Sequence, residues 1–198
     1  GEAGEGRIAH EIEHAQVPAI DADYRAALRL FVAEEGRHGR ILGFMVRALG
    51  GKLAARNWTE RLFVFGRRLL GLRLKLMVLL VAEVVGGAFY GLLASRLPAG
   101  GLRRGLEQIC EDEQHHLDYH GEFFARQGWG APMRAAWQVA WWGLALAAMG
   151  VVLVDHRRTL RTMGIPLMEA VRAFLGLARE AASHLPLFPA ERSAMTEP

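Results

Sequence analysis

Two short segments of the chain place a carboxylate and an imidazole three residues apart in apolar surroundings. Residues 35–38 read Glu-Gly-Arg-His, and residues 113–116 read Glu-Gln-His-His. On a helix, positions i and i+3 lie on one face about a turn apart, so each segment presents an acid and a histidine together. Carboxylate oxygens and imidazole nitrogens are ligands for first-row metal ions. Both segments are therefore candidate metal-binding segments, provided that they face the protein interior.

The spacing of apolar residues predicts that they do. Apolar side chains recur every three or four residues along four stretches, which is typical of helix faces turned toward a core. The stripes and the polar residues on them are 5–15 (Glu5), 24–49 (Glu35, His38), 72–90 (Glu83) and 102–124 (Glu113, His116, His120). Four acids and at least two histidines are thus predicted to point inward.

An internal repeat relates the four acids. Glu35 follows Glu5 by 30 residues, and Glu113 follows Glu83 by 30 residues, with the second pair offset from the first by 78. If each pair belongs to a helical hairpin that turns about midway between its acids, both acids of a pair lie at about the same height, because each residue adds 1.5 Å along a helix. The repeat predicts two hairpins that bring the acids together.

Ionised carboxylates in a core are costly unless they are neutralised, paired or bound to a cation. The stripes carry no lysine or arginine beside these acids. A shared metal is the simplest compensation, although an acid satisfied by hydrogen bonds in a metal-free bundle remains the alternative. A third Glu-x-x-His, formed by Glu11 and His14, lies about 10 Å from the level of Glu35 and is predicted to be on the surface.

The fold class predicted is all-α. Glycine and proline punctuate the 198 residues at wide intervals, and the segments between them have helix length. We expect a single domain over residues 1–185, with a four-helix di-metal core over 1–127, accessory helices over 132–185 and a tail over 186–198.

The ligand pattern, one Glu from each of two helices and a Glu-x-x-His from each of two others, resembles the ferritin-like di-iron carboxylate superfamily of rubrerythrin, quinone hydroxylase and N-oxygenase-like bundles. The opening AGEGRIA also looks like the quinone hydroxylase branch. The resemblance implies two iron ions, or manganese or a mixed pair. It implies Glu35 and Glu113 as bridging ligands, Glu5 and Glu83 as terminal ligands, and one imidazole per metal. His120 resembles the extra histidine of some di-iron N-oxygenases, but a buried or outer-shell histidine is the other interpretation.

The function expected from this resemblance is that of an O2-activating oxidase or oxygenase. It would act on an apolar small molecule and draw on an external electron donor. Small residues after Glu83, at positions 86–88, could leave room for the substrate, although they also suit close helix packing. The alternatives are an iron-binding or peroxide-scavenging protein without an organic substrate, and a metal-free, membrane-associated bundle.

Charge and composition narrow the class of partner. A net charge of +3 is too small to argue for nucleic acid, and a single cysteine excludes an internal disulfide, which fits a cytoplasmic protein. Residues 135–154 carry one polar side chain, Gln138, between Arg134 and Asp155. This length suits a helix buried on all sides in a bundle, a peripheral contact with a membrane surface, or a membrane span. A homodimer is also compatible with the sequence.

Overall fold

The computed structural model describes residues 5–53 and 71–185, and for residues 5–8 and 184 the backbone alone. All regular structure in this part of the chain is helical, which confirms the predicted all-α class. The helices are α1 (Glu5–Glu13), α2 (Ala22–Ala48), α4 (Leu72–Arg96), α5 (Gly101–Ala125), α6 (Ala131–Asp155), α7 (Arg157–Thr162) and α8 (Leu167–His184).

The helix boundaries follow from local residue chemistry. Asp21 precedes α2, and its side chain accepts a hydrogen bond of 2.8 Å from the backbone N–H of Tyr24, as an N-cap should. Gly50, Gly128 and Gly164 have φ angles of 74°, 63° and 65°, which side chains other than glycine adopt reluctantly. These glycines lie after α2, α5 and α7, where the sequence predicts turns.

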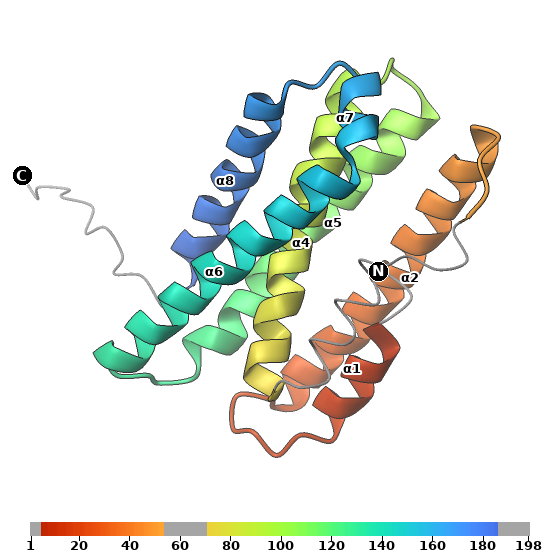
Figure 1. Ribbon diagram of the computed structural model, residues 1–198. Helices are drawn as coiled ribbons and strands as arrows, with labels where there is room; N and C mark the ends of the chain where they lie inside the picture. The colour runs from red at the N-terminus through yellow and green to blue at the C-terminus, as the bar shows by residue number, and fades with distance from the viewer. Residues whose placement is uncertain (1–4, 54–70, 186–198) are drawn as a thin grey trace, which may run out of the picture.

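Helix α4 lies at the centre of the arrangement. It runs beside α5, and α6 and α8 cover another side of it, while α2 packs against α5 with α1 alongside (Figure 1). Glu83 is the only charged residue of α4 between Lys75 and Arg96. A helix covered from several directions is apolar around its circumference, which explains this composition.

The predicted inward stripe of α2 is largely confirmed. Tyr24, Leu28, Phe31 and Met45 are buried together with the polar residues between them. Leu49, which the stripe includes, is instead 71% exposed because α2 ends at Ala48. The long connection expected between the two hairpins falls mostly on residues 54–70, which lie outside the described residues.

Helix α6 is not buried on all sides. Only 11% of its most apolar 18-residue window is buried, against 67% of the corresponding window of α4. Both helices are long and apolar enough to cross a membrane by composition alone. The difference arises because α6 lies on the outside of the bundle, where one face contacts α4 and α8 and the opposite face has no neighbour in the described part of the chain.

Candidate metal centre

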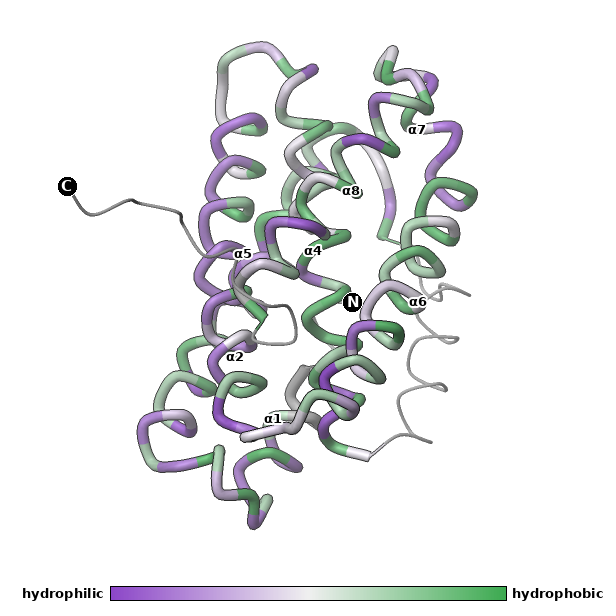
Figure 2. The backbone as a smooth tube through the Cα atoms, turned by 90° about the vertical axis from the view of Figure 1, so that its left-hand side faces the viewer, coloured by the Kyte–Doolittle hydropathy of each residue, from purple (hydrophilic) through white to green (hydrophobic). Residues whose placement is uncertain are grey.

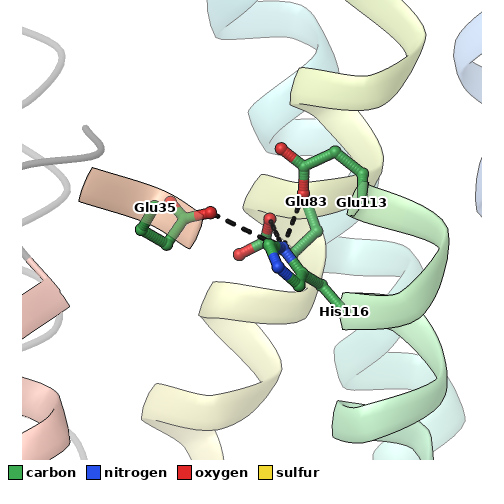
Figure 3. Close-up of side chains that lie close together, drawn as sticks. All are labelled: Glu35, Glu83, Glu113 and His116. Atoms are coloured by element: carbon green, nitrogen blue, oxygen red, sulfur yellow. Dashed lines mark hydrogen bonds and ion pairs between the residues drawn. The ribbon is translucent and has the colours of Figure 1, made fainter. Parts of the chain in front are cut away.

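Three helices bring four potential metal ligands together inside the protein. Glu35 comes from α2, Glu83 from α4, and Glu113 and His116 from α5 (Figure 3). One ligand atom of each lies within 4.8 Å of the others, and all four side chains are buried. Ligands that bind a cation at 2.0–2.6 Å are separated by up to about 4–5 Å, so this group can hold a metal ion.

His116 is surrounded by the three acids. Its Nδ1 lies 3.2 Å from a carboxylate oxygen of Glu113 and 3.5 Å from an oxygen of Glu83. The same nitrogen lies 3.5 Å from Oε1 of Glu35. Nδ1 is therefore the atom of His116 that faces the candidate site.

His38 approaches the acids from the other side. Its Nδ1 lies 3.2 Å from Oε1 of Glu35 and 3.6 Å from Oε1 of Glu113. The structure thus brings His38 into contact with the group, although it is not one of the four closest ligands. Glu35 and Glu113 each lie near both histidines, whereas Glu83 lies near His116.

The outer nitrogens of both histidines are held by carboxylates that the sequence analysis did not single out. His38 Nε2 donates to Asp112 at 2.9 Å, and His116 Nε2 donates to Glu34 at 3.1 Å. Asp112 also accepts a 2.6 Å hydrogen bond from Arg37. Each helix therefore orients the histidine of the other.

A signal for these two carboxylates is present in the sequence. An acid immediately precedes the Glu of each motif, so the segments read Glu34-Glu35-x-x-His and Asp112-Glu113-x-x-His. A histidine whose outer N–H bonds to a carboxylate presents its other nitrogen in a fixed direction, as metal-binding histidines do. The paired acids thus match the requirements of two imidazole ligands.

The pKa shifts of Glu83 and His116 reflect the burial of several acids close together. Burial, and then the nearby charge of Glu113, raise the pKa of Glu83 well above its usual value. Burial alone would lower the pKa of His116, but contact with Glu83 and the charges of the neighbouring acids raise it. The metal-free group therefore retains protons that a cation would displace.

His120 is buried close to His116 but is not one of the four converging residues. Its relative exposure is 0%, and neither ring nitrogen has a hydrogen-bond partner among the described residues. Its ring lies edge-on to that of Phe31, 5.2 Å between centroids. Burial, and then the neighbouring His116, lower the pKa of His120 to about 3, so the ring is neutral at physiological pH.

The space after Glu83 is occupied by packing. A Cβ atom at Gly87 would lie 3.2 Å from Leu177 of α8 and 3.7 Å from the Cβ of Glu113. Gly87 therefore allows α4 to approach α5 and α8 closely, and the expected substrate space at this residue is filled by Leu177.

The remaining predicted positions lie in α1 or directly after it. The side chain of Glu5, predicted as a terminal ligand, lies outside the described residues. Glu11 and His14 are exposed, as predicted, and Glu11 pairs with Lys75 of α4 at 2.7 Å.

Comparison of the chain with family models, with curated proteins and with solved structures gives no match. The buried Glu35, Glu83, Glu113 and His116 group, which can hold a metal ion, is thus interpreted from its own geometry.

Proposed function

We propose that the protein is a ferritin-like, non-haem di-iron oxidase or oxygenase that activates O2. The observation that carries this proposal is the buried group of Glu35, Glu83, Glu113 and His116, with the ring of His38 against the same acids. Mixed carboxylate and imidazole ligands suit iron, and manganese as well.

The positions of the two histidines support a pair of metal ions. Glu35 and Glu113 each lie within 3.6 Å of Nδ1 of both His38 and His116, which is the placement expected of bridging carboxylates. Glu83 lies beside His116 and would be a terminal ligand there. In the internal repeat Glu5 corresponds to Glu83, so Glu5 would be the terminal ligand of the metal next to His38.

The surrounding residues would orient the ligands and exclude water. Asp112 and Glu34 fix the proton on the outer nitrogen of each histidine and leave Nδ1 for the metal. The ring of Phe31 packs edge-on against His116 at 4.7 Å between centroids and shields the site with an apolar wall. When bound, iron would supply redox chemistry with O2, using electrons from an external donor. The apolar surroundings suit an apolar small-molecule substrate.

Metal analysis of protein purified from iron-supplemented cells tests whether the site binds iron. We expect iron to accompany the wild type and to be lost from Glu113→Ala. Glu111→Ala is the matched control, because Glu111 is exposed on the same helix two residues away. Equal iron in all three proteins would refute the site, and manganese in place of iron would identify the other metal.

Oxygen consumption by the reduced, iron-loaded protein tests whether the centre activates O2. We expect uptake that increases with a suitable lipophilic substrate and that falls to background in His116→Ala. His115→Ala is the control, since His115 is adjacent but exposed. Uptake and product formation equal in both variants would exclude catalysis at this centre. Iron binding without substrate oxidation would favour the iron-handling alternative.

A further inference from the structure

The outer face of α6 is an exposed apolar feature that the metal centre does not explain. Of the 25 residues in this helix, only Trp141 and Ala145 are buried. These two side chains face the interior, and the opposite side is open to solvent. An apolar helix that serves only as a core element is covered, as α4 is, and α6 is not.

The exposed side chains of α6 form a continuous stripe. Val139, Leu146 and Val154 are 75%, 48% and 57% exposed. Exposed small residues continue this stripe at helical spacing, namely Ala136, Gly143, Ala147 and Gly150. Figure 2 shows α6 at the edge of the molecule with mostly hydrophobic or neutral residues along its length. Contiguous exposed apolar surface of this kind marks an interaction site, unlike apolar residues scattered singly.

Both ends of this stripe are cationic. Arg134 is exposed in the first turn of α6, and Arg157, Arg158 and Arg161 are exposed on α7, just beyond its last turn. No charged residue lies between Arg134 and Asp155. An apolar stripe with arginines at its ends is complementary to a surface in which an anionic outer layer covers an apolar layer.

We propose that the outer face of α6, together with the arginines of α7, docks on an anionic lipid bilayer. The helix would lie in the plane of the membrane, with Val139 and Leu146 among the acyl chains and the arginines at the phosphate level. Its inner face stays packed on α4 and α8. This inference is independent of the chemistry at the metal centre.

A second copy of the chain fits this face less well than a bilayer does. A helix of 25 residues is about 37 Å long and about 10 Å wide, which gives a face of about 370 Å². Specific interfaces bury about 800 Å² per partner. In addition, both ends of the stripe are positive, so parallel and antiparallel pairing of two α6 helices would each bring arginines together.

Sedimentation of the full chain with vesicles tests the proposal. Two vesicle types are compared, phosphatidylcholine alone and an equal mixture of phosphatidylcholine and phosphatidylglycerol. We expect the protein to bind the mixed vesicles and to bind the neutral vesicles more weakly. High salt should weaken the binding to the mixed vesicles. Absence of binding to the mixed vesicles would overturn the proposal.

Two pairs of variants locate the surface. Leu146→Asp should abolish binding, whereas Leu30→Asp should not, because Leu30 is equally apolar and 68% exposed but lies on α2. Arg157→Gln combined with Arg158→Gln should weaken binding to anionic vesicles about 25-fold, at about fivefold per arginine. Arg29→Gln with Arg40→Gln removes the same charge from α2 and should have much less effect.

The results distinguish a bilayer from a second copy of the chain as the partner of the outer face of α6. Equal losses for the α6 and α2 variants would show that α6 is not the docking surface, and thermal unfolding of each variant checks that the fold is intact. Sedimentation velocity without vesicles tests self-association. A dimer that Leu146→Asp dissociates would overturn the membrane assignment in favour of a second copy.

Discussion

At the scale of single residues, the candidate centre depends on acids with two different tasks. Glu35, Glu83 and Glu113 converge on the site, while Asp112 and Glu34 lie behind the histidines and hold their outer nitrogens. The side chain of Asp112 is 7% exposed and that of Glu34 is 31% exposed. Water can replace Glu34 more readily than it can replace Asp112, so the two residues should contribute unequally.

Asp112→Asn is expected to lower the affinity for a divalent metal by about 10–100-fold, the usual effect of losing a carboxylate behind a ligating histidine. Glu34→Gln should have a smaller effect, because solvent reaches that contact. Competition titration of the metal-free proteins with cobalt(II), whose absorption reports on its ligands, measures both. A larger loss for Glu34→Gln than for Asp112→Asn would contradict this ranking of the two contacts.

The surroundings of His120 allow us to predict how its replacement changes the stability of the protein. Its ring is fully buried without a hydrogen-bond partner among the described residues, at a cost of about 1–3 kcal/mol. His120→Leu, of similar volume, should therefore stabilise the metal-free protein by about this amount in urea unfolding at pH 7. His115→Leu, at an exposed position, is the control.

The same substitution should change the pH dependence of stability. The pKa of His120 is lowered to about 3 in the folded protein, from 6.5 in the unfolded chain. Between these values the unfolded chain binds the extra proton, so folding stability falls as the pH falls from about 6.5 toward 3. His120→Leu should flatten this part of the profile. If the variant is instead less stable and also loses metal, His120 is a ligand.

At the scale of helices, hydrophobic periodicity predicted which faces of α2 and α5 point inward. The candidate ligands Glu35 and Glu113 were found because they interrupt apolar stripes at helical spacing. Asp112 was missed because it lies one residue off the stripe, where a polar residue normally faces solvent. It is buried because it reaches across to a histidine of another helix, a contact that depends on tertiary packing.

The surroundings of α6 were equally beyond prediction from hydropathy. Helices α4 and α6 have similar apolar windows, and both suit burial or a membrane. Whether neighbours cover a helix depends on how the connections place it. Only the packing shows that α4 is central and α6 peripheral.

Close packing between α2 and α5 depends on a glycine. A Cβ atom at Gly105 of α5 would overlap the terminal carbon of Met45 and lie 3.2 Å from Ile41, both on α2. Gly105→Ala gains helix propensity but must displace both side chains. Gly176→Ala, on an open face of α8 with nothing within 4 Å, gains propensity alone.

We therefore expect Gly176→Ala to stabilise the protein by about 0.5–1 kcal/mol. Gly105→Ala should be less stable than Gly176→Ala by about 1 kcal/mol, the lower end of the usual cost of overpacking, because the flexible end of Met45 can move aside whereas the β-branched Ile41 must shift. Chemical denaturation of both variants checks the difference. Equal stability would mean that α2 and α5 are not in close contact at this level.

At the scale of the whole molecule, the candidate centre connects the two sides of the bundle. Its ligands belong to α2 on one side and to α4 and α5 on the other. A metal bound there holds the helices together only in the folded state, since the unfolded chain separates the ligands. Metal binding should therefore stabilise the whole fold rather than one helix.

Free metal at 100 times its dissociation constant stabilises a folded protein by about 2.7 kcal/mol, which for a chain of this size raises Tm by about 5–10 °C. We expect iron(II), added anaerobically to the metal-free protein, to produce such a shift and a chelator to reverse it. Glu113→Ala should show no shift, although its metal-free form should be at least as stable as the wild type, because a buried carboxylate beside Glu83 is removed. Glu111→Ala should respond as the wild type does. An equal shift in Glu113→Ala would place the stabilising metal elsewhere, because losing one of four converging ligands must weaken a metal held at this site.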